Sequence, residues 1–193
     1  MGGDASAIAD VARLRERLGS RTIALVGLMG AGKTTVGRRL ASLLGLPFRD
    51  SDVEIEEVSR MTIPELFEAY GEPEFRALEA RVVQRLAVEG PQVVGTGGGA
   101  YMNGETRERL KSTAVTVWLK ADLDTLMERV SRRSNRPLLK TADPRETMRR
   151  LIKERYPIYG QADIVIESRN VKREQVASEV AEAVQAFLER NER

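Results

Sequence analysis

Residues 27–34 read Gly-Leu-Met-Gly-Ala-Gly-Lys-Thr, and they carry the clearest chemical signal in the chain. They fit the P-loop pattern Gly-x-x-x-x-Gly-Lys-Ser/Thr, in which backbone N–H groups surround phosphate oxygens. An apolar strand pattern at 22–26 precedes the motif and a helical pattern at 33–44 follows it, as the motif requires. We therefore predict an ATP site formed by Gly30, Ala31, Gly32, Lys33, Thr34 and Thr35.

Two side chains of this loop have predicted roles. Lys33 is expected to reach the β- and γ-phosphates and to contribute to catalysis, and Thr34 to bind Mg²⁺ through its hydroxyl. A P-loop alone does not separate kinases from GTPases or motor ATPases. The chain has no Asn-Lys-x-Asp sequence for guanine and is short for a motor, which favours a compact kinase.

Asp50-Ser51-Asp52 follows a short strand pattern at 47–49. At the end of a parallel strand, two carboxylates can share one site, where one holds Mg²⁺ through water and the other accepts a hydrogen bond, and then the proton, from a substrate hydroxyl. The alternative is structural, since Asp-Ser-Asp also suits a helix N-cap.

Two further segments could bind the acceptor. Arg76 and Glu79 are three residues apart on a helical pattern, so Arg76 could clamp a carboxylate with its planar fork or form an ordinary surface ion pair with Glu79. An apolar strand pattern then ends in Gly97, Gly98 and Gly99, a turn that would let the backbone approach a ligand closely.

The amino-acid composition excludes several kinds of functional site. The chain has neither cysteine nor histidine, which excludes disulfides, cysteine or histidine metal sites and histidine-based triads. Ten acidic and two basic residues lie in 50–79, whereas ten basic and three acidic residues lie in 129–155. The basic excess is therefore local, which suits polyphosphate binding, although a solvated helix face is the simpler reading. Aromatic residues make up only 5%, which argues against nucleic-acid binding.

The elements that must position these residues alternate along the chain. Strand patterns at 22–26, 47–49, 92–95, 114–119 and 163–167 are separated by helical patterns, which predicts an α/β fold with a parallel sheet and crossover helices. We expect an N-terminal helical extension over 1–20, one kinase domain over 21–193 with an acceptor region near 50–80, and a mobile lid over 131–143. No signal peptide or membrane span is evident, so we expect a cytoplasmic protein.

From about Arg21 onward the chain resembles the shikimate kinase family. The resemblance rests on the P-loop, on Asp50-Ser51-Asp52, on Phe75-Arg76 with Glu79, and on the triglycine turn. The fifth motif is Arg136-Pro137-Leu138-Leu139 together with the later Arg155-Tyr156-Pro157-Ile158-Tyr159. Five motifs in this order are far more specific than a P-loop alone.

The resemblance implies MgATP-dependent phosphorylation of the 3-hydroxyl of shikimate, in the pathway to aromatic amino acids. It assigns Asp52 to the acceptor hydroxyl as the base, and Asp50 to the neighbourhood of Mg²⁺. Carboxylate binding falls to Arg76 and Arg155, and the pocket lining to Gly97, Gly98 and Gly99. On the lid, Arg136 would neutralise charge on the transferring phosphoryl group, and Arg132 would support nucleotide binding.

The resemblance also implies a three-layer α/β/α P-loop fold with five parallel strands. We expect the protein to act on small molecules as a monomer, with no nucleic-acid or membrane partner. The loop 167–172 lacks the proline that often packs on adenine in this family, so the adenine contacts are unassigned. The alternatives are a kinase of aminoshikimate or a gluconate-like acid and, further away, a noncatalytic nucleotide-binding module or a nucleic-acid-associated ATPase.

Overall fold

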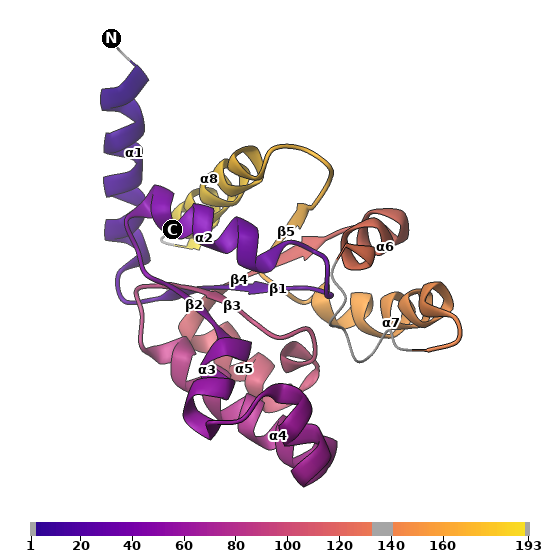
Figure 1. Cartoon of the computed structure of the whole chain (residues 1–193). Helices are drawn as coiled ribbons and strands as arrows, with labels where there is room; N and C mark the ends of the chain where they lie inside the picture. The colour runs from indigo at the N-terminus through magenta and orange to yellow at the C-terminus, as the bar shows by residue number, and fades with distance from the viewer. Residues whose placement is uncertain (1–2, 133–140, 192–193) are drawn as a thin grey trace.

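The computed structural model of the protein describes residues 3–132 and 141–191 (Figure 1). Its strands are β1 (Thr22–Val26), β2 (Phe48–Asp50), β3 (Val93–Gly95), β4 (Ala114–Lys120) and β5 (Ile164–Glu167). Its helices are α1 (Gly3–Leu18), α2 (Lys33–Leu44), α3 (Ser51–Ser59), α4 (Ile63–Val88), α5 (Gly104–Thr113), α6 (Leu123–Ser131), α7 (Pro144–Tyr159) and α8 (Arg173–Asn191), with a 3₁₀ turn η1 (Ala100–Met102).

The five strands form one parallel sheet in the order β2-β3-β1-β4-β5. The predicted α/β class, the parallel sheet and all five strands are confirmed, with each boundary within one residue of its prediction. The chain first runs from β1 toward β2 and β3 and later returns to the other side of β1. The carboxyl end of β1 is therefore the topological switch point, where open α/β sheets bind ligands.

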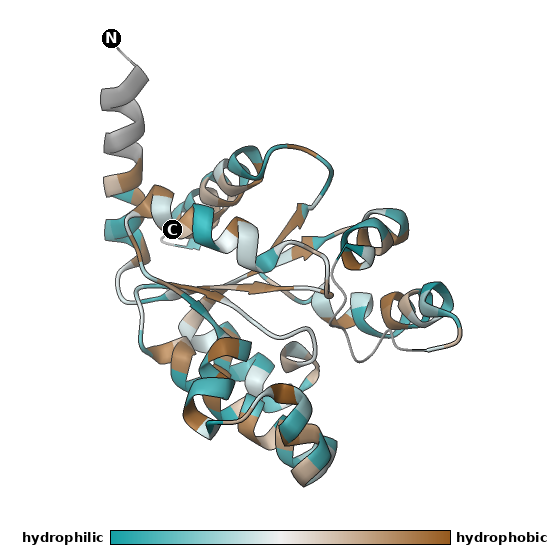
Figure 2. Cartoon of the chain, viewed as in Figure 1, coloured by the Kyte–Doolittle hydropathy of each residue, from teal (hydrophilic) through white to brown (hydrophobic). Residues whose placement is uncertain are grey.

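Helices cover both faces of the sheet, which gives three layers (Figure 1). One face carries α1, α2 and α8, and the other carries α4 and α5. The inner strands β1, β3 and β4 are buried and mostly apolar, as Figure 2 shows at the centre of the molecule, because a parallel sheet is covered on both faces. The edge strands β2 and β5 are only partly buried. The main core is built on β1 and β4 and on the buried stripes of α2 and α8.

A second, smaller apolar cluster lies in the predicted acceptor region. It joins α3 and both ends of α4 through Ile55, Leu66, Phe75 and Leu86. Within α4 the backbone breaks at Gly71, where φ is 78° and ψ is 173°, two residues before Pro73. The break divides α4 into two helical segments that both reach the same cavity.

The helix predicted within the N-terminal extension 1–20 is present as α1, which begins at Gly3. Its last turn is anchored, since Leu14 and Leu18 are buried in the main core. No helix within residues 3–132 and 141–191 is long and apolar enough to span a membrane.

Candidate active site

A cavity of about 770 Å³ opens at the carboxyl ends of β1, β2 and β3. Both groups of predicted site residues line it, the phosphate-binding group and the acceptor-binding group. The described residues of the prediction that line it are Gly30, Gly32, Lys33, Thr34, Thr35, Asp50, Asp52, Arg76, Gly97, Gly98, Gly99, Arg132 and Arg155. Ala31 is buried behind the loop, and Arg136 lies outside the described residues.

The P-loop connects β1 to α2 and presents the N-terminus of α2 to the cavity. Gly32 caps α2 in the left-handed conformation (φ 95°), and its carbonyl accepts the first helical hydrogen bond from Val36. The Lys33 ammonium lies over the loop and donates to the carbonyls of Gly27 (2.7 Å) and Leu28 (2.8 Å). A helix N-terminus combined with a lysine is a ready anion site.

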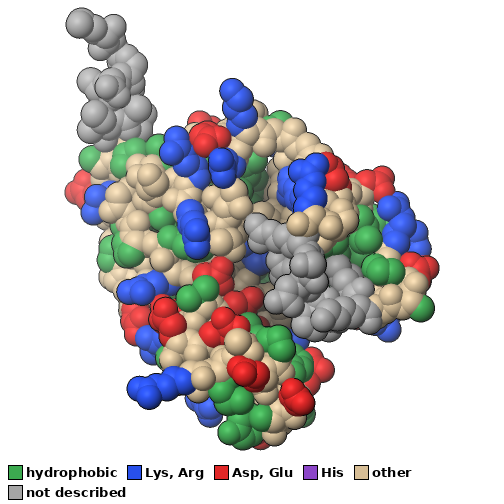
Figure 3. Space-filling model, in the orientation of Figure 1, with side chains coloured by type: hydrophobic (Ala, Val, Ile, Leu, Met, Phe, Trp, Pro, Cys, Tyr) green, Lys and Arg blue, Asp and Glu red, His purple; other side chains and the backbone are tan. Residues whose placement is uncertain are grey.

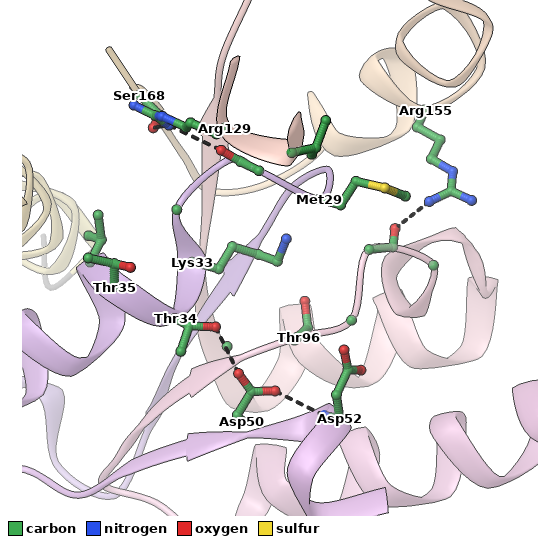
Figure 4. Close-up of a pocket in the computed structure, with 18 of the residues that line it drawn as sticks. Met29, Lys33, Thr34, Thr35, Asp50, Asp52, Thr96, Arg129, Arg155 and Ser168 are labelled. Carbon is green, nitrogen blue, oxygen red and sulfur yellow. Dashed lines mark hydrogen bonds between the residues drawn. The ribbon is translucent and has the colours of Figure 1, made fainter. Parts of the chain in front are cut away.

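Thr34 and Asp50 meet below the loop. The Thr34 hydroxyl donates to Asp50 Oδ2 at 2.8 Å, while Asp50 Oδ1 caps α3 by accepting from the Asp52 N–H at 3.1 Å (Figure 4). The helix-cap alternative is therefore correct for Asp50, and it coexists with a position beside the P-loop. A hydroxyl and a carboxylate held together offer the hard oxygen ligands that Mg²⁺ prefers, and Mg²⁺ usually completes its shell with water and phosphate oxygens.

The ion pair between Arg76 and Glu79 is not an ordinary surface pair. Its Nη1 donates to Glu79 Oε2 at 2.8 Å, and the Glu79 side chain is only 4% exposed. The exposed Glu72 accepts from the other edge of the guanidinium at 3.2 Å. Burial lowers the pKa of Arg76, but the two glutamates outweigh it and leave that pKa above its usual value. The paired glutamates hold the fork in place at the cavity wall.

Side chains predicted to bind the acceptor approach Gly97 and Gly99 of the triglycine turn so closely that they occupy the space where Cβ atoms would lie. A Cβ on Gly97 would be 2.6 Å from Glu79 Oε1 and 2.9 Å from Asp52 Oδ1. A Cβ on Gly99 would be 2.3 Å from Arg76 Nη1. The turn is itself held down by the Ser51 hydroxyl, which accepts from the Gly97 N–H at 2.8 Å. The backbone of the turn thus lies in close contact with Asp52, Arg76 and Glu79.

Arg155 enters the cavity from α7. Its Nη1 donates to the Gly98 carbonyl at 3.0 Å (Figure 4). Gly98 thus adjoins Arg155, and the next residue, Gly99, adjoins Arg76. The Tyr159 hydroxyl, one helical turn further along α7, donates to the same carbonyl. The structure therefore places the two arginines predicted to bind a carboxylate, one on α4 and one on α7, beside the same turn.

Sequence reasoning missed a hydrogen-bonded cluster beside the P-loop. Arg129 Nη1 donates to the carbonyl of Gly30 (3.2 Å) and to Ser168 Oγ (2.8 Å), and its Nη2 donates to the carbonyl of Arg169 (2.9 Å). Ser168 Oγ in turn donates to the Ala31 carbonyl at 2.6 Å. Burial lowers the pKa of Arg129, although a guanidinium stays charged at neutral pH. Arg129 and Ser168 therefore join the P-loop to the β5–α8 loop.

The apolar register of α6 could have identified Arg129. Leu126 and Val130 are the buried face of α6, and Arg129 adjoins that face. Arg132, which we predicted as a nucleotide contact, lines the cavity rim, but its side chain is 72% exposed and pairs with Glu128 at 2.5 Å.

Charge is distributed around the cavity as the sequence indicated. Acidic side chains gather over α3 and α4, and basic side chains lie toward α6 and the β5–α8 loop (Figure 3). No cluster of three or more acidic residues that could hold a metal by itself occurs in the described part of the chain. A divalent cation here would have to be shared with a phosphate ligand.

Comparison with known proteins identifies relatives over most of the chain. The family model described as shikimate kinase matches residues 29–185. A shikimate kinase of Brucella canis is 56% identical over 179 residues, which are 93% of this chain and 90% of the relative. One from Rhizobium leguminosarum is 62% identical over 172 residues, which are 89% and 88% of the two chains.

Solved structures agree with the sequence relatives. A shikimate kinase from Acinetobacter baumannii in complex with shikimate has a TM-score of 0.85 and 39% identity, and the match covers 90% of this chain and 97% of that one. A gluconokinase from Sinorhizobium meliloti has a TM-score of 0.51 but only 17% identity, which shows a shared fold alone.

Proposed function

Because this chain belongs to the shikimate kinase family, we propose that it transfers the γ-phosphoryl group of ATP to the 3-hydroxyl of shikimate. The products are 3-phosphoshikimate and ADP, in the route to chorismate and the aromatic amino acids. The observation that carries the proposal is the cavity itself, because a P-loop and a carboxylate-plus-hydroxyl site line one continuous space. An enzyme that joins a phosphate donor to a small hydroxy acid needs this arrangement.

The nucleotide occupies the P-loop end of the cavity in our proposal. Backbone N–H groups of residues 30–35 and the Lys33 ammonium bind the phosphates. The adenosine end lies toward Arg129 and the segment 168–171, which line the cavity beyond the loop. Arg132 borders the same end, and Arg136 is proposed to meet the transferring group from the lid.

Shikimate occupies the other end. Arg76 and Arg155 bind the carboxylate from the two sides of the triglycine turn, because each guanidinium can form charge-assisted hydrogen bonds with it. Asp52 accepts a hydrogen bond from the 3-hydroxyl. As the oxygen–phosphorus bond forms and the bond to the β–γ bridging oxygen breaks, the hydroxyl proton passes to Asp52.

Thr34 and Asp50 would hold Mg²⁺, Thr34 directly and Asp50 from close by, since their oxygens are 2.8 Å apart beside the P-loop. The bound ion would neutralise phosphate charge in the transition state. Asp50 also fixes the start of α3 and thereby the position of Asp52. We also propose that the enzyme acts on small molecules as a monomer.

The test is ADP release with MgATP and a panel of shikimate, aminoshikimate, gluconate and AMP. We expect strong turnover with shikimate alone. Asp52→Ala should abolish transfer while ATP binding, measured by calorimetry, is retained, because Asp52 contacts the acceptor rather than the nucleotide. Turnover with another panel member instead would agree with a kinase reaction but contradict shikimate as the substrate. Loss of ATP binding in Asp52→Ala would overturn the role of Asp52.

A further inference from the structure

The carbonyl of Gly98 is the meeting point of two donors from α7. Arg155 Nη1 donates to it at 3.0 Å, and the Tyr159 hydroxyl donates to it as well. A carbonyl oxygen has two lone pairs, so these two donors satisfy it fully. Both lone pairs of the Gly98 carbonyl are thus occupied by donors from α7. The turn can still donate hydrogen bonds to a ligand through its N–H groups.

The N–H groups of Gly98 and Gly99 are available for that purpose. Within residues 3–132 and 141–191, neither has a hydrogen-bond partner, although both residues line the cavity. They lie where a carboxylate is expected, because Gly98 borders Arg155 and Gly99 borders Arg76. In a trans peptide the C=O and the next N–H point in opposite directions, so the anchor on the Gly98 carbonyl also fixes the direction of the Gly99 N–H.

A run of glycines cannot fix this orientation by itself. Glycine adopts both signs of φ readily, so the Gly98–Gly99 peptide plane needs an external anchor. Tyr159 provides a rigid one. Its side chain is fully buried and stacked on Tyr101, with the Trp118 ring centroid 5.9 Å away. Burial raises the pKa of Tyr159 to about 12, so the hydroxyl keeps its proton at neutral pH and remains a donor.

We propose that Tyr159 is a positioning residue for the acceptor: its hydroxyl, together with Arg155, orients the Gly98–Gly99 peptide so that the turn and Arg155 are set for the shikimate carboxylate. The inference rests on the proposed function and deepens it. Tyr159 does not contact the reacting atoms in this scheme. It acts through Gly98, and its effect should therefore appear in acceptor binding.

Tyr156 provides a matched control on the same helix. Its hydroxyl also donates to a backbone carbonyl, that of Ala121, and burial likewise raises its pKa to about 12. Ala121 is outside the cavity lining. Tyr156→Phe and Tyr159→Phe therefore remove the same kind of hydrogen bond and leave the ring in place, and only the second touches the triglycine turn.

The experiment compares steady-state kinetics of the wild type, Tyr156→Phe and Tyr159→Phe. Loss of one hydrogen bond predicts a rise of about three- to tenfold in the shikimate KM of Tyr159→Phe, with the ATP KM and kcat within about twofold of the wild type. Tyr156→Phe should leave all three constants within about twofold. Equal effects of the two variants would overturn the proposal.

Shikimate methyl ester sharpens the test, because it lacks the carboxylate charge. If Tyr159 acts through the carboxylate site, Tyr159→Phe should weaken the binding of the ester less than it weakens the binding of shikimate. Calorimetry on the folded fraction of each protein measures both affinities. A defect of the same size with acid and ester would show a purely structural role. Failure of the wild type to phosphorylate shikimate would instead overturn the proposed function, which separates the two outcomes.

Discussion

Asp50 shows how one side chain can serve both folding and chemistry. One carboxylate oxygen caps α3, and the other accepts from Thr34 in the P-loop. The cap alone explains why an aspartate precedes this helix, since an N-cap carboxylate satisfies an otherwise unpaired N–H. The bond to Thr34 is the part that local sequence could not show. It ties the acceptor helix to the phosphate loop.

Tyr159 leads to a prediction about stability at high pH. Burial raises its pKa to about 12 in the folded protein, whereas tyrosine in an unfolded chain ionises near 10. The folded state therefore binds more protons at high pH. The contribution of Tyr159 to the free energy of unfolding is therefore complete below about pH 10 and is lost as the pH rises through about 12.

We therefore expect the free energy of unfolding of the wild type to fall by about 1 kcal/mol more than that of Tyr159→Phe between about pH 9 and pH 11. Phenylalanine cannot ionise, so the variant lacks this component. Urea unfolding of both proteins at the two pH values measures the difference. If the free energy of unfolding fell equally for both proteins between the two pH values, Tyr159 would ionise as easily in the folded chain as in the unfolded one.

At the scale of elements, Ser168 joins the β5–α8 loop to the P-loop. Its hydroxyl donates to the Ala31 carbonyl and accepts from Arg129, so Ser168→Ala removes two of the bonds between these loops. We expect the ATP KM to rise about fivefold, from a loss of about 1 kcal/mol, with the shikimate KM unchanged. Initial-rate kinetics against each substrate give both constants.

The control for this change is Ser112→Ala. Ser112 is exposed, and its hydroxyl donates to the Arg109 carbonyl within α5 at 2.9 Å. The same substitution there should leave both KM values at the wild-type level. An unchanged ATP KM in Ser168→Ala would show that the P-loop keeps its shape without this connection.

Gly71 controls how the two segments of α4 meet. Its φ of 78° and ψ of 173° fall in a region essentially restricted to glycine. Gly71→Ala should lower the free energy of unfolding by about 1–3 kcal/mol. It should also raise the shikimate KM more than the ATP KM, because Ile63 and Phe67 before the break line the same cavity as Arg76 after it.

Gly104→Ala is the matched control for Gly71→Ala. Gly104 begins α5, and a Cβ there would meet only Arg107 Nη2, at an ordinary 3.9 Å. We expect its free energy of unfolding to stay within about 0.5 kcal/mol of the wild type. If Gly71→Ala behaved like Gly104→Ala in urea unfolding and kinetics, the break in α4 would not depend on glycine.

Local pattern and long-range contact explain what the sequence could and could not predict. The strands and α2 follow from apolar runs and from the P-loop, and their boundaries were predicted within one residue. The apolar register of α6 places Arg129 beside its buried face, but its partner Ser168 is about 40 positions away, and the partner of Ser168, Ala31, is about 140 positions away. At these separations periodicity carries no information about which residues meet. Tyr159 stood in a recognised segment, but only the fold reveals its bond to Gly98.

At the scale of the whole molecule, the position of β1 in the sheet determines where the substrates meet. β1 is the central strand, with β3 and β2 on one side and β4 and β5 on the other, so the loops after β1, β2 and β3 lie at one edge of the sheet. Residues of α1 and α8 pack into the main core. Stability and catalysis are therefore partly separable. Residues of α1 stabilise the fold without lining the cavity in the described part of the chain.

Leu18→Ala tests this separation. Leu18 is 1% exposed at the end of α1, and truncating a buried leucine costs about 2–5 kcal/mol. We expect Tm to fall by about 5–15 °C while kcat and both KM values at 25 °C stay within about twofold. Leu43→Ala, the same substitution at a side chain 42% exposed on α2, should cost at most about 1 kcal/mol. A change in either KM of Leu18→Ala, measured on the folded protein, would mean that α1 influences the active site and that the core transmits its packing to the P-loop.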